Sequence, residues 1–324
     1  VNVITKSGTN QHKGSSHIFH RNDGLNSRAE NPDGTQAEKY DFEQNQLGFT
    51  FGGPLKKDKI FYFITLDYQE GDSTKQTDPS RIEQRVVDVL ASLGSPNENG
   101  PITRSDNAWA FSLKTDFNLN NSNQLTLRFN ATDSEQENGT FDVDSWGVSA
   151  NADELDDSYA FTGALNTVFG DSIYNELRVQ YAREERPREY HGPNIAGTNR
   201  PFPDTAFDFG SSYRFGMPFF IPVEYHDTRF QINENISFLR GSHLIKAGLE
   251  YNKTAAFQTF IGFANGRFIF SSTDGFINYV NNPSYVECSD GSSSNDGTCP
   301  EGTEIVGPVL LYLQQVGVGG LSVE

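Results

Sequence analysis

A period-two alternation of apolar and polar residues runs through most of this sequence and constrains its fold more than any other feature. Between residues 123 and 132, Leu125, Leu127 and Phe129 would share one face of a strand, and Thr126 and Arg128 would share the other. The same alternation recurs in the segments 105–117, 157–169, 172–185 and 242–256. Alternation over such lengths is typical of long β-strands with one apolar and one polar face.

The connections between the predicted strands distinguish one β architecture from another. We expect strands near residues 11–21, 41–53, 60–70, 105–117, 123–134, 157–169, 172–185, 225–239, 242–256 and 308–319. The links between them are alternately long and short, and the short ones are 54–59, 118–122, 170–171 and 240–241. A sandwich has no reason to place every long connection at one end. This asymmetry predicts an all-β chain, an antiparallel up-and-down transmembrane β-barrel with tight periplasmic turns and large external loops.

Charge and composition agree with this prediction. The chain carries 25 basic and 43 acidic residues, a net charge of −18, which argues against a nucleic-acid partner. Its 26 Phe and 13 Tyr residues, beside a single Met, suit an all-β chain with aromatic strand positions. The sequence contains no apolar run long enough for a membrane-spanning helix, whereas barrel strands hide their hydrophobicity in alternation.

The long loops carry local signals of their own. Ser80-Arg81-Ile82-Glu83 has the S-x-x-E pattern of a capping box, and it predicts a helix that ends at Gly94. A second loop helix is expected at 271–280. Cys288 and Cys299 share one polar stretch and predict a local disulfide, which implies an oxidising compartment. The alternative, a metal site, is disfavoured because two thiolates without a nearby His do not fill a tetrahedral shell.

The N-terminal residues resemble a known family. The opening VNVITKSGTN, followed by HKGSSHIFHRNDGLNSR, resembles the junction between plug and barrel in TonB-dependent outer-membrane receptors, closest to the Oar-like group. The segment from Gln44 to Phe63 resembles the second strand, first periplasmic turn and third strand of that family. The resemblance implies that residues 1–10 are the end of a plug domain and its hinge, and that residues 11–324 are the N-terminal part of the barrel.

The resemblance also implies a fragment and a set of partners. The sequence supplies about ten of the roughly 22 strands expected, so the barrel would be incomplete and the TonB box and most of the plug would be missing. The implied partners are TonB, reached through the missing plug, the lipid of a Gram-negative outer membrane, and an unidentified ligand. No cofactor is implied.

Two groups of side chains are candidates for contact with plug or ligand. Alternation turns one set of charged residues towards the lumen, and the Arg-Asn-Asp motif adds two more, which gives Arg21, Asp23, Lys114, Asp116, Arg128, Glu176, Arg178, Lys246 and Glu250. For Arg21 and Asp23, the alternative is a strand end with local side-chain turns. Ligand specificity is expected in the aromatic-rich loop 186–224, at Tyr190, Phe202, Phe207, Tyr213, Phe219 and Phe220.

Metal binding is a weaker prediction. An acidic stretch contains Asp142, Asp144, Asp153 and Asp156, whose spacing partly matches a calcium loop but lacks its final Glu. The alternative is a solvated acidic loop. His12, His17 and His20 do not form a site, because His17 would lie on the opposite face of a strand from the other two.

These patterns predict a TonB-dependent receptor or transporter fragment that couples energy to the passage of a ligand. One alternative is a secreted or surface β-rich adhesin, which predicts shorter strands and no end-to-end asymmetry of loops. Another is an enzyme built on a barrel. The sequence contains no G-x-S-x-G, no H-E-x-x-H and no phosphate-binding Gly loop, so no enzymatic activity is expected.

Overall fold

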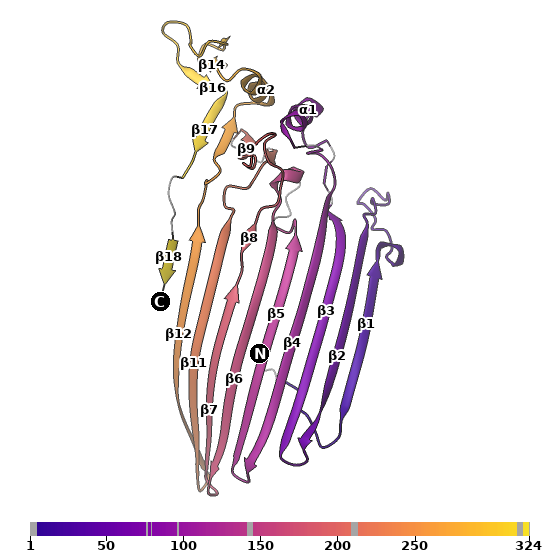
Figure 1. Cartoon of the computed structure of the whole chain (residues 1–324), viewed down its shortest axis with the longest axis vertical. Coiled ribbons are helices and arrows are strands. Elements are labelled where there is room, and N and C mark those ends of the chain that lie inside the picture. Colours follow the sequence, from indigo (N-terminus) through magenta and orange to yellow (C-terminus); the bar gives the residue numbers. More distant parts are fainter. Residues whose placement is uncertain are drawn as a thin grey trace.

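The computed structural model describes residues 5–75, 77–78, 80–95, 97–140, 145–208, 213–315 and 320–323, and one large antiparallel sheet dominates it (Figure 1). Each long strand pairs with the next along the chain. In sheet order the strands are β1 Lys13–Asn22, β2 Phe42–Lys56, β3 Ile60–Lys75, β4 Ile102–Asn120, β5 Asn123–Glu137, β6 Asp153–Phe169, β7 Ile173–Glu185, β11 Val223–Arg240, β12 His243–Phe260 and β18 Gly320–Val323. The short β8, Arg188–Glu189, pairs with both β6 and β11.

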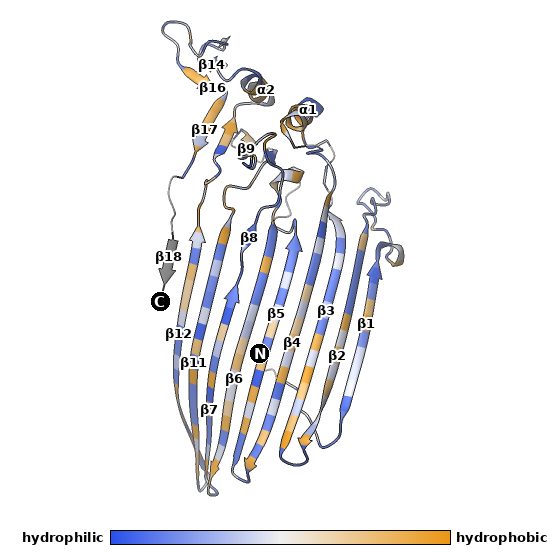
Figure 2. Ribbon diagram, in the orientation of Figure 1, coloured by the Kyte–Doolittle hydropathy of each residue, from blue (hydrophilic) through white to orange (hydrophobic). Residues whose placement is uncertain are grey.

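The pairing register gives the sheet one apolar and one polar face. Phe129 lies opposite Phe161, which lies opposite Tyr181, which in turn lies opposite Phe230, so four neighbouring strands align aromatic side chains in one row of the apolar face. Phe161 is 53% exposed, and no other part of the described chain covers this face. Hydropathy alternates along the strands accordingly (Figure 2). A sheet with an uncovered apolar face is suited to lipid contact.

The two ends of the sheet differ sharply. The short connections gather at one end, here called the turn end, where Gly170 and Gly241 adopt positive φ of 58° and 61° in tight turns. The long connections lie at the other end, here called the loop end. The long strands β1 to β12 range from 10 residues in β1 to 19 in β4, which confirms the predicted long strands and the predicted asymmetry.

Apart from the connection between β1 and β2, the long connections fold together into one unit, here called the loop module, formed by the described residues of 80–101, 145–152, 187–222 and 261–315 (Figure 1). It contains a four-stranded sheet, two helices, a one-turn helix and a three-stranded sheet. These are β10 Arg214–Phe215, β9 Asp204–Phe207, β13 Arg267–Phe270 and β17 Val309–Leu313; α1 Gln84–Leu93 and α2 Thr273–Asn281; η2 Val148–Ala150; and β15 Ser293–Ser294, β14 Val286–Cys288 and β16 Ile305–Gly307. Aromatic and aliphatic side chains from these connections form its core: Ile82, Val86, Val87, Leu90, Phe202, Phe207, Tyr213, Phe215, Phe270 and Phe276.

The capping-box prediction was wrong, although the helix exists. Helix α1 begins at Gln84, and its N-cap residue Glu83 makes no side-chain capping bond. Ser80 instead donates its hydroxyl to Asp78 Oδ1 at 2.8 Å, in a local turn before the helix. Gly94 ends the helix as predicted, with a φ of 113°. None of the described helices is long and apolar enough to span a membrane.

The two ends of the chain differ in part from what the sequence predicts. The strand predicted at 308–319 was wrong as a single element, because β17 belongs to the loop module and only β18 pairs with β12. Among the described residues β1 pairs only with β2 and β18 only with β12, so the described sheet has two open edges, as expected of an incomplete barrel. Of residues 1–10, expected to be the end of a plug and its hinge, the structure describes residues 5–10. The 3-10 helix η1, Asp23–Leu25, follows β1.

Candidate functional site

The polar face of the sheet collects the charged side chains that alternation assigned to the lumen. Lys114 lies opposite Arg128, and Asp116 lies opposite Thr126, which donates its hydroxyl to Asp116 Oδ1 at 2.7 Å. The register places the remaining members on the same face: Glu176, Arg178, Lys246 and Glu250. Neighbours along a strand pair their charges, with 3.9 Å between Lys114 Nζ and Asp116 Oδ2 and 3.1 Å between Arg178 Nη2 and Glu176 Oε1. The polar face therefore presents a hydrogen-bonding surface with matched charges.

A segment that precedes β1 lies across this polar face near the turn end. Lys114 Nζ donates to Ser7 Oγ at 2.8 Å, which links the segment to β4. Residues 6–9 line one side of a groove of about 360 Å³ whose other side includes Thr50 and Phe63. A Cβ on Gly8 would lie 2.3 Å from the Tyr62 carbonyl oxygen, so only glycine allows this approach to β3.

Asn10 fixes the end of that segment to the first tight turn. Its side-chain Nδ2 donates to Asp58 Oδ1 at 2.5 Å, and its Oδ1 accepts the Asp58 backbone N–H at 2.8 Å. Asp58 adopts a φ of 63°, and its carbonyl oxygen accepts a bond from Asn118 Nδ2 at 2.9 Å. Sequence reasoning missed this contact. The only signal was an Asn that ends the Lys-Ser-Gly-Thr-Asn turn and an Asp in the turn 54–59.

A polar cavity of about 770 Å³ opens on the same face at the loop end. The side chains around it supply amides, carboxylates, guanidinium groups and a phenol: Gln69, Asp106, Gln136, Glu154, Asp156, Arg186, Arg188 and Tyr225. Arg188 Nε lies 3.2 Å from Glu154 Oε1, and Arg186 Nη2 lies 2.9 Å from Asp227 Oδ2. The volume of this cavity is within the range of sites that bind small molecules.

Arg21 and Asp23 behave as a local strand end. Arg21 Nη1 donates to Gln44 Oε1 at 3.5 Å, and its guanidinium lies 5.4 Å from the Phe42 ring centre. Asp23 begins η1, whose N-cap Asn22 accepts the Leu25 N–H at 2.9 Å. These contacts agree with the local-turn interpretation of the Arg-Asn-Asp motif.

Three of the aromatic residues predicted to contact ligand are interior instead. Phe202, Phe207 and Tyr213 are 3%, 6% and 6% exposed and pack in the core of the loop module, which corrects the expectation that they form a binding surface. Burying these large apolar rings in the protein lowers the free energy more than leaving them exposed to water in a long loop would. Tyr190 is half-buried and donates its hydroxyl to the Ser149 carbonyl at 2.9 Å, and burial raises its pKa.

Phe219 and Phe220 are also half-buried. Phe219 stacks on Phe263 with ring centres 4.9 Å apart, and the Arg267 guanidinium lies 4.7 Å from the centre of the Phe219 ring. Phe220 packs edge-on to Phe219 and contacts Trp146. Both side chains therefore hold the module together, and part of each ring stays accessible.

Two buried carboxylates join separate connections of the module. Glu98 accepts bonds from Ser95 Oγ at 2.6 Å and from Ser149 N and Oγ at 3.0 and 2.6 Å, and burial raises its pKa. Asp204 lies between Arg214 Nε at 3.1 Å and Arg267 Nε at 3.4 Å. Burial raises the Asp204 pKa to about 6 in spite of the two arginines.

Of the four acidic residues proposed for calcium, the structure describes Asp153 and Asp156, and these two lie on opposite faces of β6. Asp142 and Asp144 lie outside the described residues. Asp153 accepts the Asn138 N–H at 3.0 Å and faces His191 Nδ1 at 2.6 Å, and this contact raises the His191 pKa. Asp156 is three positions further along β6 and therefore points to the opposite face, so Asp153 and Asp156 do not share an ion. No cluster of three or more metal-binding side chains occurs in the described part of the chain.

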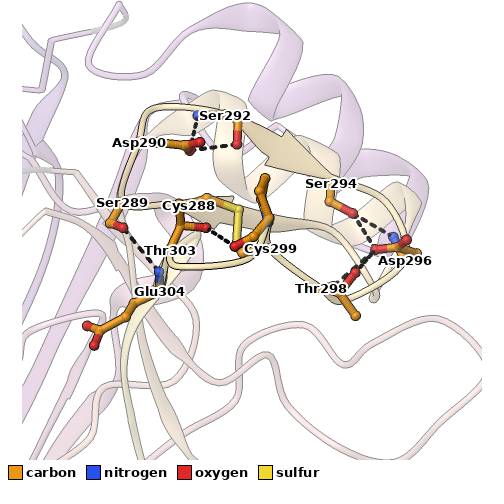
Figure 3. Close-up of a disulfide and its surroundings, with 11 residues drawn as sticks. Cys288, Ser289, Asp290, Ser292, Ser294, Asp296, Thr298, Cys299, Thr303 and Glu304 are labelled. Carbon is orange, nitrogen blue, oxygen red and sulfur yellow. Dashed lines mark hydrogen bonds between the residues drawn. A yellow bond between two sulfur atoms is a disulfide. The ribbon is translucent and has the colours of Figure 1, made fainter.

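The predicted disulfide is present, and it lies in the loop module. Cys288 and Cys299 are joined by a disulfide, with their Cα atoms 5.8 Å apart. The bridge closes the loop that carries β15, and turns built on Asp290 and Asp296 flank it (Figure 3). Ser289 Oγ accepts the Glu304 N–H at 3.1 Å and ties the loop back to the segment before β16. The disulfide thus stabilises a hairpin at the far tip of the module.

A protein-family model and the structure of one outer membrane transporter agree with this architecture. The model of the outer membrane beta barrel domain family matches residues 4–81 and 71–289. The outer membrane transporter YddB from Escherichia coli has a similar structure, with a TM-score of 0.54 at 10% identity, over 97% of this chain and 36% of that protein. The siderophore receptor PirA from Acinetobacter baumannii gives a TM-score of 0.45 at 15% identity, over 80% of this chain and 32% of its own. No curated protein matches by sequence.

The family match covers far more than half of the sequence, and the sheet, its two faces and its two unequal ends have the geometry of a barrel wall. The chain spans about a third of the length of YddB, 36%. It belongs to the outer membrane beta barrel domain family, and its sheet lies in the outer membrane of a Gram-negative bacterium.

Proposed function

We propose that this chain is part of a TonB-dependent transporter that uses energy delivered through TonB to move a ligand across the outer membrane. The observation that carries the proposal is the path of residues 6–10. They lie on the polar, lumenal face of the wall, where Lys114 binds Ser7 and Gly8 contacts the backbone of β3. A chain that enters β1 from the lumen suits a preceding domain that sits inside the barrel.

The polar face has a defined role in this proposal. Matched charges such as Lys114 with Asp116 and Arg178 with Glu176 offer a plug hydrogen bonds without a large electrostatic preference. An interface with paired charges avoids leaving a desolvated charge alone. Residues 1–10 are then the end of the plug and its hinge, and residues 11–324 are barrel. Membership of the Oar-like group is part of the same proposal and rests on the Lys-Ser-Gly-Thr-Asn and Arg-Asn-Asp motifs.

The cavity at the loop end supplies a route for the ligand. It is polar and lies on the lumenal face, so a ligand that passes the loop module meets hydrogen-bonding groups there. The sandwich-like adhesin predicted shorter strands and no asymmetry of loops. Strands such as β4, with 19 residues, and the gathering of long connections at one end contradict it.

The test measures binding between the intact receptor that carries this chain, purified in detergent, and the purified periplasmic domain of TonB. We expect saturable binding by surface plasmon resonance. A porin-type barrel immobilised on a reference channel controls for non-specific binding. Lack of binding by a receptor that migrates as folded on an unheated gel would contradict energy coupling through TonB.

A further inference from the structure

We propose that Asn10 and Asp58 form a fixed anchor, which holds residues 7–10 against the barrel wall while force is applied to the chain on their N-terminal side. This inference rests on the proposed function, because only an energy-coupled receptor is pulled from that direction. Asn10 and Asp58 are then positioning residues, since the segment 7–10 that they hold is the point at which the moving part of the protein ends.

The geometry of the pair suits an anchor. Asn10 both donates to and accepts from Asp58, at 2.5 and 2.8 Å, so the two residues are held in one relative orientation. The turn that carries Asp58 is itself tied to β4, because Asn118 Nδ2 donates to the Asp58 carbonyl and Asn118 N donates to the Lys59 carbonyl. The anchor therefore connects to β2 and β3, which the turn joins, and also to β4.

The position of the anchor explains why the barrel needs one. Strand β1 pairs only with β2 among the described residues, and its ladder begins with Lys13 opposite Gly52. A pull on the chain before β1 would load this first pair alone and would open the ladder one pair at a time. The anchor lies three residues ahead of Lys13, so it takes the load before the ladder does. Lys114, bonded to Ser7, and the tight fit of Gly8 add contacts on the same segment.

The chemistry of the pair allows a matched set of variants. Asn10→Asp places two carboxylates face to face and removes the Nδ2 donor, and a lost charge-assisted hydrogen bond corresponds to a factor of about ten or more. Adding Asp58→Asn restores both bonds with the side-chain donor and acceptor exchanged, since the amide introduced by this second substitution would donate to the carboxylate introduced by the first. Asn tolerates the positive φ at position 58 as well as Asp does.

The experiment reports on the segment through a single thiol. Ser7→Cys is introduced into the intact receptor in a background otherwise free of unpaired cysteine, since both cysteines of this chain are joined in a disulfide. Cells are treated with a biotin maleimide small enough to enter the periplasm through porins. The rate of labelling is measured with the proton gradient intact and after an uncoupler has dissipated it.

The anchor predicts that the thiol introduced by Ser7→Cys, at an exposed position, is labelled at the same rate in both conditions in the otherwise native receptor. Asn10→Asp should raise the labelling rate when the gradient is intact above the rate after it is dissipated, and Asn10→Asp with Asp58→Asn should remove this difference. Faster labelling with the gradient intact than without it, in the receptor without anchor substitutions, would overturn the proposal, because the segment would then move. Equal rates with and without Asn10→Asp in both conditions would also overturn it.

A failure of the proposed function gives a different pattern. If Asn10→Asp raises labelling equally with and without the gradient, and the double variant reverses this, the pair holds the segment but nothing pulls on it. That result supports the contact as an anchor and contradicts energy coupling.

Discussion

The sheet and the loop module use the same kinds of side chain in opposite ways. In the sheet, Phe161 and Leu249 are 53% and 74% exposed, and the apolar face has no protein cover among the described residues. In the loop module, Phe215 and Leu90 are 2% and 0% exposed at the centre of an ordinary core. The difference shows that burial in protein is not what stabilises the sheet. Lipid takes the place of the core on one face, and hydrogen bonds between strands satisfy the backbone.

The largest effect expected from this comparison is on the module. Phe215→Ala should destabilise the loop module by about 4 kcal/mol, because it leaves a cavity among Phe202, Phe207 and Phe276. The rate of trypsin cleavage within the module measures this change. The shift in gel mobility between heated and unheated protein reports on the sheet and should not change.

Tyr312→Ala is the matched control, since Tyr312 lies in the same module but is half exposed. Its effect should be much smaller. If Phe215→Ala also abolishes the gel-mobility shift, the module and the sheet fold as one unit and the contrast between them fails.

A charge on the apolar face tests the other half of the comparison. Phe161→Arg should cost about 3 kcal/mol in a lipid bilayer, because it places a guanidinium in the hydrocarbon region and removes the contact with Phe129 at 4.6 Å between ring centres. Guanidinium titration of the protein folded in vesicles measures the change. Gln180→Arg, one strand away on the polar face, should cost less than about 1 kcal/mol. Equal losses would show that the polar face also meets lipid.

The stability of the loop module should depend on pH between about 4 and 7. The Asp204 pKa is about 6 in the folded module against an ordinary 3.8, so the folded state holds a proton that the unfolded state releases between these values. Stability therefore falls as pH rises through this window, by about 2 kcal/mol between pH 4 and pH 7. Glu98, whose pKa burial also raises, adds to the same slope.

Trypsin resistance of the module across this pH range, corrected for the activity of the protease, checks the prediction. Asp204→Asn with Glu98→Gln should flatten the profile. A native module that becomes more resistant as pH rises from 4 to 7 would show that the sign is wrong.

The smallest expected effect concerns the start of α2. Ser272 accepts the Gly275 N–H at 3.0 Å as its N-cap, so Ser272→Ala should cost the module about 1 kcal/mol. Hydrogen exchange of the amides at the start of α2 provides the measurement. Ser92→Ala, at an exposed position inside α1, should leave its helix unchanged or slightly more stable. A loss at Ser92 as large as that at Ser272 would argue against a specific capping effect.

Sequence periodicity was sufficient to predict the strands of the sheet and insufficient to predict the fold of the loop module. Strands with a lipid face alternate over most of their length, so nine of them were located to within a few residues and the charged side chains named from alternation were assigned to one face. In the module, Phe202 and Phe215 come from one loop and meet Leu90 and Phe276 from two others. No local pattern encodes such a meeting, so the same aromatic residues were assigned to a ligand surface.

The contacts of the candidate site likewise differ in whether the sequence alone could predict them. Lys114 and Asp116 could be placed on the lumenal face because alternation alone fixes it. The bonds between Asn10 and Asp58 could not be predicted, because they join residues 48 positions apart through the turn geometry at Asp58. The strand expected at 308–319 failed for a related reason: its apolar residues also fit an edge of the small sheet in the module.

The unequal ends of the sheet set where the chain tolerates insertion. One residue added to the tight turn at Gly170 would shift β7 by one position and send Tyr181 and Val179 into the lumen while Arg178 entered the membrane. The long connections at the loop end impose no such parity on the strands that follow them. Epitope tags or new binding segments of any length can therefore be grafted at exposed positions there, such as the connection between β1 and β2, and the strands below will keep their faces.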